Sequence, residues 1–82
     1  MKYKYYETEE ESVKEFKKEC RYIIIGESTT AHCCFSYSIV DTREGLESFG
    51  NYWKKTICET NGELEDAVRI CEALNLAYSY VL

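Results

Sequence analysis

The run Tyr22-Ile23-Ile24-Ile25 constrains this chain most, because it is uncharged and rich in β-branched residues. Such residues favour extended backbone, and a run without polar alternation predicts a strand that is buried on both faces or nearly so. Eighty-two residues provide one core, so we expect a single compact domain over residues 1–82. The hydrophobic content of 45% is ample for that core and argues against disorder.

Three other segments have the alternating pattern of strands. Apolar and polar residues alternate from Ala31 to Val40, and the turn-like segment Gly26–Thr30 before it predicts a hairpin with the isoleucine run. Weak alternation from Lys2 to Tyr6 predicts a first strand, and alternation from Leu76 to Leu82 predicts a last one.

Helices are predicted between these strands from their start signals. Thr8-x-x-Glu11 has the pattern of a capping box, and the helix that follows runs to about Cys20. Asp41-x-x-Glu44 repeats this pattern before a second helix, whose apolar face would be Leu46, Phe49, Trp53 and Ile57.

A glycine interrupts the second helical segment. Asn61-Gly62 is expected to end that segment, since glycine readily adopts the left-handed conformation that stops a helix. A further helix is predicted from Glu63 to Leu74, and its buried stripe would be Leu64, Ala67, Val68, Cys71 and Leu74.

The predicted element order is therefore β-α-β-β-α(α)-β, which is the order of the ferredoxin-like split βαβ fold. We expect an α+β domain with a four-stranded, mostly antiparallel sheet and helices on one face. Right-handed crossovers would place the first two strands parallel to each other, with the third between them.

The charge balance limits the partners of the chain. Ten Lys and Arg residues against fifteen Asp and Glu give a formal net charge of −5, which argues against direct nucleic-acid binding. Apolar runs are far shorter than the ~20 residues that span a bilayer, so no membrane partner is expected. The N-terminus, Met1-Lys2-Tyr3-Lys4-Tyr5, lacks the apolar core of a signal peptide, so we expect a cytoplasmic protein.

The five cysteines do not have the spacing of a disulfide framework or of a zinc site. We expect reduced thiols and no cofactor. His32 and Cys34 share a strand face and could join one distant cysteine at a metal, but the preferred interpretation is no metal. The same pair lacks a third orienting group for nucleophilic catalysis, so we expect no catalytic residues and no enzymatic activity.

Two surfaces are candidates for partner binding. The first is acidic and comprises the two predicted helix starts, where carboxylates either offset the helix dipole or recognise a basic surface: Glu9, Glu10, Glu11, Glu63, Glu65 and Asp66. The second is an open sheet face of small residues that includes Ser36, Ser38, Ala77 and Ser79. Such a face, beside an exposed edge strand, predicts a homodimer or a monomer that covers the face with its target.

These features favour a non-enzymatic module that binds a larger, basic partner stoichiometrically. In size, charge and compactness the chain resembles phage-encoded inhibitors of host defence, including anti-CRISPR proteins. The resemblance implies inhibition of a nucleic-acid-handling nuclease complex in the host cytosol, where an acidic surface would compete with phosphate. The alternative is a small ligand-sensing or metal-binding regulatory domain.

Overall fold

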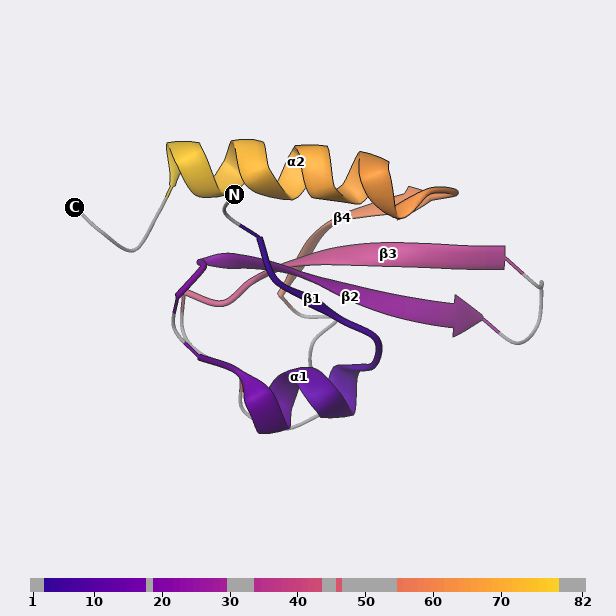
Figure 1. Cartoon of the computed structure of the whole chain (residues 1–82), viewed down its shortest axis with the longest axis horizontal. Coiled ribbons are helices and arrows are strands. Elements are labelled where there is room, and N and C mark those ends of the chain that lie inside the picture. Colours follow the sequence, from indigo (N-terminus) through magenta and orange to yellow (C-terminus); the bar gives the residue numbers. More distant parts are fainter. Residues whose placement is uncertain (1–2, 18, 30–33, 44–45, 47–54, 79–82) are drawn as a thin grey trace.

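The computed structural model describes residues 3–17, 19–29, 34–43, 46 and 55–78, and only the backbone of residues 27–29, 34 and 35. These residues form a small α+β fold with a four-stranded mixed sheet and two helices (Figure 1). The predicted α+β class and four-stranded sheet are therefore confirmed. Neither described helix is long and apolar enough to cross a membrane.

The strands follow one another across the sheet in chain order, β1-β2-β3-β4. β1 is parallel to β2, whereas β2–β3 and β3–β4 are antiparallel, so the sheet is mostly antiparallel as predicted. The strands are β1 (Tyr5–Tyr6), β2 (Tyr22–Thr29), β3 (Cys34–Asp41) and β4 (Thr56–Asn61).

The third strand was predicted to lie between the first two, and this is wrong for β1, β2 and β3. The ferredoxin-like topology is not confirmed. β1 pairs directly with β2, in a register that places Tyr5 opposite Ile24. The hairpin with β3 occupies the other edge of β2, so β2 lies between β1 and β3. Ile23, Ile24 and Ile25 of β2 are fully buried, so the predicted burial of this strand on both faces is confirmed.

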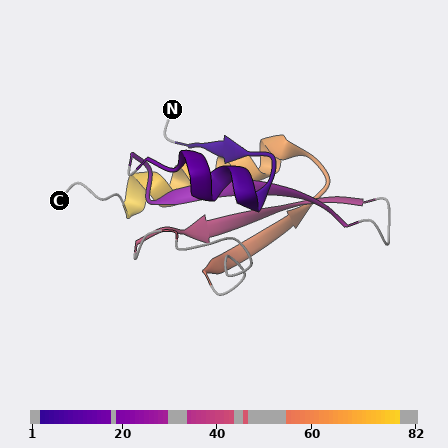
Figure 2. The ribbon, with the colours of Figure 1, turned by 90° about the horizontal axis from the view of Figure 1, so that it is seen from below.

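The two helices, α1 (Glu9–Glu15) and α2 (Leu64–Ala77), pack on opposite faces of the sheet (Figures 1 and 2). The prediction of helices on one face is therefore wrong. Alternation along β2 explains the difference, because successive side chains point to opposite faces. Ile23 and Ile25 are fully buried on the α1 side, and Ile24 is fully buried on the α2 side.

Each face has its own apolar cluster. On the α1 side, Phe16 and Leu46 pack against buried Tyr6 and Val40. On the α2 side, the predicted helix stripe is confirmed: Ala67 and Cys71 are fully buried, and Leu64, Val68 and Leu74 pack around them.

A helix was predicted from Asp41 to Ile57, and this is wrong at both ends, where the described residues belong to strands. Asp41 is the last residue of β3, where its carboxylate accepts two hydrogen bonds from Arg21 at 3.2 Å. Thr56–Asn61 is β4, and burial alternates along it with a period of two, which leaves Ile57 50% exposed. Glu44, Phe49 and Trp53 of the predicted helix lie outside the described residues.

Three other boundaries also differ. α1 ends at Glu15 rather than near Cys20, because Phe16 has extended backbone. β2 continues to Thr29 through the segment predicted as a turn. Leu76 and Ala77 belong to α2 rather than to a last strand, and residues 79–82 of that predicted strand lie outside the description.

Gly26 lies in β2 beneath an aromatic ring. Gly26 pairs with Tyr37 in the ladder, and the ring of Tyr5 lies over it. A Cβ at Gly26 would be 2.7 Å from the Tyr5 hydroxyl oxygen, so a side chain there would displace the ring. Tyr5 also packs against Tyr37, with 6.1 Å between the ring centroids.

Candidate functional site

The N-terminus of α1 begins as the sequence predicts. Thr8 is the N-cap, and its Oγ1 accepts a hydrogen bond from the Glu11 N–H at 3.1 Å. This contact satisfies one of the free amides of the first turn. Glu9, Glu10 and Glu11 form that first turn, where their charges complement the helix dipole.

Negative charge is concentrated around α1. Five of the nine residues from Glu7 to Glu15 are glutamates, and Lys14 is the one basic residue among them. Lys14 pairs with Glu10 at 3.0 Å. Within the described ion pairs, none offsets the charges of Glu7, Glu11 and Glu15.

Glu11 and Glu15 lie on the same side of α1 because they are four residues apart, and Glu7, just before the N-cap, is close enough for its charge to act on Glu11. Partial desolvation, a hydrogen bond with Glu15 and the charges of Glu15 and Glu7 raise the pKa of Glu11 above its ordinary value of 4.5. A shallow depression of about 270 Å³ lies beside this row and is lined by Thr8, Glu10, Glu11, Lys14 and Glu15. We call Glu7, Glu11 and Glu15 the α1 glutamate row.

The second predicted acidic group lies at the start of α2. Glu63 is the N-cap but makes no side-chain capping hydrogen bond, and its carbonyl accepts from the Asp66 N–H at 3.2 Å. Glu65 pairs with Arg69 at 2.8 Å. All three acidic residues are exposed, and Arg69 offsets part of their charge.

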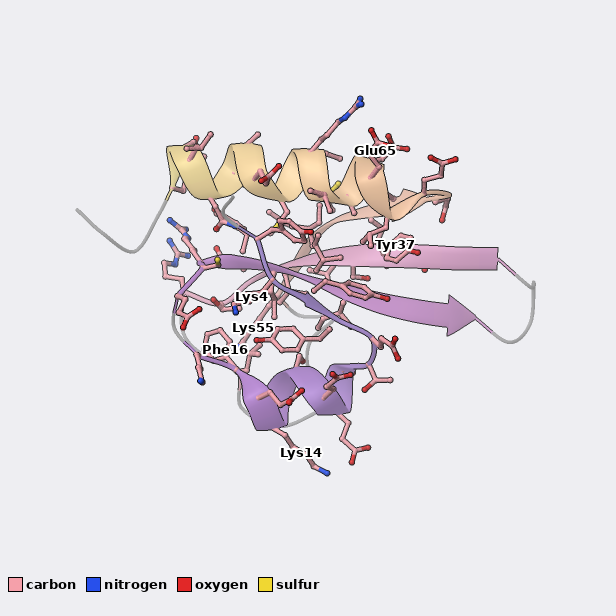
Figure 3. All side chains as sticks on the ribbon, in the orientation of Figure 1. Lys4, Lys14, Phe16, Tyr37, Lys55 and Glu65 are labelled. Atoms are coloured by element: carbon pink, nitrogen blue, oxygen red, sulfur yellow. The ribbon has the colours of Figure 1, made fainter. Side chains whose placement is uncertain are left out.

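The structure does not bring the two acidic groups together. Glu65 lies on the α2 side of the sheet and Lys14, which pairs with Glu10, lies on the α1 side (Figure 3). A flat partner surface on one side of the sheet therefore meets one group and not the other.

The predicted face of small residues is only partly described. Ser36 is half-buried in β3, opposite Glu27 of β2 and Asn61 of β4. Ser38, assigned to the same open face, is fully buried, so that part of the prediction is wrong. Ser79 and His32, together with the side chain of Cys34, lie outside the description, and the predicted dimer stays a prediction.

The described thiols lie in different environments. Cys20, Cys58 and Cys71 are free, with Cys20 and Cys71 buried and Cys58 half-buried. Burial, with Cys20 nearby, raises the pKa of Cys71 to about 12. Among the described residues, no group of three or more His, Cys, Asp and Glu side chains could hold a metal ion.

Sequence reasoning missed two members of the α1 glutamate row. Glu7 lies before the helix and Glu15 at its last position, so neither belongs to the acidic first turn that the capping pattern indicates. The spacing of four residues between Glu11 and Glu15 was the available signal for Glu15, whereas Glu7 precedes the helix and helical spacing does not place it.

Comparison of the chain with protein-family models, with curated proteins and with solved structures finds no match.

Proposed function

We propose that this protein is a non-enzymatic binding module that inhibits a larger, basic, nucleic-acid-handling partner through the α1 glutamate row. The observation that carries the proposal is the crowding of Glu7, Glu11 and Glu15 without an ion-paired cation among the described residues. Like charges this close repel one another, and a cationic surface would relieve the repulsion while it binds.

The row is better suited to this role than the α2 start. Arg69 already pairs with Glu65, so a partner would have to compete with a cation of the same helix. The row also borders a depression in which Lys14 is already paired with Glu10, which leaves Glu11 and Glu15 for a cation of the partner. Arginine and lysine side chains on the partner are the expected contacts, because they are the groups that bind phosphate in nucleic-acid channels.

The proposal is tested with two variants of equal net charge. In the first, Glu7, Glu11 and Glu15 are replaced by glutamine; in the second, Glu63 and Glu65 become glutamine and Asp66 becomes asparagine. A nuclease complex captured from cells with a nuclease-based defence system is purified, and binding of each variant is titrated.

We expect the α1 variant to lose binding and the α2 variant to keep it. Rising salt should slow association of the unmodified protein more than it speeds dissociation. Inhibition of the nuclease should be complete near one protein per complex. Inhibition at much lower ratios would indicate turnover, and equal weakening by both variants would mean that net charge alone governs binding; either result contradicts the proposal.

A further inference from the structure

The dipeptide Asn61-Gly62 connects β4 to α2 at the surface. Asn61 is the last residue of β4, and both residues are exposed. Gly62 has a φ of 112°, in the region that favours glycine, and a Cβ built on it would meet nothing within 4 Å. The described atoms therefore leave this junction open to solvent.

We infer that Asn61 is a site of spontaneous deamidation, at which the neighbouring peptide supplies the nucleophile and water is the co-reactant. The Gly62 backbone nitrogen loses its proton to solvent and attacks Cγ of Asn61. A bond forms between that nitrogen and Cγ, the Cγ–Nδ2 bond breaks, and the nitrogen of the side-chain amide leaves as ammonia. The product of this step is a five-membered succinimide.

Water then opens the succinimide. Addition at Cγ breaks the new bond and gives aspartate, whereas addition at the main-chain carbonyl gives isoaspartate. The overall change consumes one water, releases one ammonia and involves no oxidation. The nucleophile needs an unhindered backbone nitrogen, and glycine is the residue that hinders it least because it has no side chain.

The fold permits the rotation that this attack needs. Asn61 must leave the extended conformation, and its cross-strand neighbour in β3 is Ser36, at the end of the ladder. Strand ends open at low free energy, so fraying of this last pair is enough. The open space around Gly62 allows the main chain to turn there without a steric clash.

Asn75 provides a contrast within the same chain. It is 3% exposed, and its amide bonds to the Tyr22 N–H, the Tyr22 carbonyl and the Cys71 thiol. It also lies inside α2 and precedes Leu76, whose side chain hinders the nucleophile. The tertiary structure thus directs the reaction to Asn61 and away from Asn75.

Deamidation would change the charge at one end of α2. A carboxylate at position 61 adds to those of Glu63, Glu65 and Asp66, and isoaspartate also lengthens the main chain by one carbon between β4 and α2. Asn75 holds the other end of the helix, so we expect a more acidic protein that keeps its fold. The inference does not depend on the proposed α1 surface, which lies across the sheet (Figure 3).

The test follows the full chain at neutral pH, both folded and denatured in urea. Peptide mass spectrometry locates each gain of one mass unit, and isoaspartate-specific methylation distinguishes the two products. We expect Asn61 to convert in the folded protein at a rate similar to that in urea. Asn75 should convert at least about tenfold more slowly when folded, because its buried hydrogen bonds must first open.

The variant Asn61→Gln is the matched control. It keeps an uncharged amide at the end of β4 but would have to close a six-membered ring, so the gain of mass at this position should disappear from the time course. Asn61 that stays intact in the folded chain while the denatured chain converts would overturn the inference. A folded chain that converts at Asn75 as fast as at Asn61 would also overturn it.

Discussion

The side-chain amide of Asn75 forms two hydrogen bonds with the backbone of Tyr22, accepting from its N–H at 2.8 Å and donating to its carbonyl oxygen at 3.0 Å. Ile24, two residues further along β2, donates its N–H to the Lys4 carbonyl, on the side of β1. Backbone groups two residues apart in a strand point the same way, so Asn75 meets Tyr22 on the edge that faces β1. A helix side chain thus extends the pairing of β2 beyond its short neighbour.

Replacement of Asn75 by alanine should therefore destabilise the fold. Both Tyr22 groups would lose a buried partner, and together these losses should lower the free energy of unfolding by about 2–4 kcal/mol. Urea denaturation followed by circular dichroism measures the change. The control is Leu76→Ala at the next position, where the side chain is 79% exposed and a change within about 0.5 kcal/mol is expected. Equal stability of the two variants would contradict this role of Asn75.

The Arg21–Asp41 pair should tolerate exchange of arginine for lysine poorly. The two nitrogens of Arg21 bond both Asp41 oxygens at 3.2 Å, and its guanidinium lies 5.1 Å from the Tyr22 ring and 5.8 Å from the Tyr78 ring. Lysine lacks the planar fork for either arrangement. We expect Arg21→Lys to lower the free energy of unfolding by about 1–3 kcal/mol.

Two comparisons test this prediction. Arg69→Lys alters an exposed ion pair and should change stability by less than about 0.5 kcal/mol.

The second comparison is the pH dependence of stability. Although burial opposes ionisation of Asp41, hydrogen bonds and charge from Arg21 and Arg43 hold the pKa of its carboxyl below the ordinary value of 3.8. A lowered pKa in the folded state means that this stabilisation is present above 3.8 and is lost as the pH falls through the folded value. A stability loss from Arg21→Lys that stays the same as the pH falls through this range would contradict the assignment.

The α1 glutamate row should have the opposite pH dependence. Glu11 has a raised pKa in the folded state, so its contribution to stability is full below 4.5 and declines as the pH rises through the folded value. Glu11→Gln removes this charge and keeps an acceptor oxygen. We expect the variant to gain stability relative to the unmodified protein as the pH rises, and to show no such gain in acid.

Thermal unfolding across the pH range measures the effect of Glu11→Gln. Glu10→Gln is the control, because Glu10 pairs with Lys14 and its replacement removes an attraction rather than a repulsion. A gain of stability that is the same for both variants would show that total charge, and not the row, is responsible.

The described thiols should differ in their reactivity toward iodoacetamide. The thiolate is the reactive form, and burial that raises the pKa of Cys71 to about 12 leaves almost none of it at neutral pH. The Cys71 thiol also donates to the Tyr22 carbonyl at 3.2 Å. We expect Cys58, which is half-buried in β4, to be alkylated in the folded protein and Cys71 only after denaturation, as peptide mass spectrometry would show. Rapid labelling of native Cys71 would contradict its burial.

Several elements were predictable from the sequence because their signals are local. Thr8 caps α1 by accepting a hydrogen bond from the Glu11 N–H, three residues further on. The apolar stripe of α2 lies on one side of a single helix. The isoleucine run predicts a strand buried on both faces, because β-branched residues favour extended backbone and no polar residue interrupts them. The spacing of Glu11 and Glu15 also predicts that they lie together, whereas the position of Glu7, which precedes the helix, does not follow from helical spacing.

The tertiary structure decided the rest, for reasons that lie outside any one segment. Ile57 has helical spacing from Trp53, and pairing with β3 is what makes its segment extended. Burial of Ile23 and Ile25 requires cover opposite α2, so α1 lies on the other face and separates the two acidic groups. From the sequence, Asn75 is a polar residue on a helix with no predicted partner. Its amide bonds the Tyr22 backbone only because the fold brings α2 close to the edge of β2.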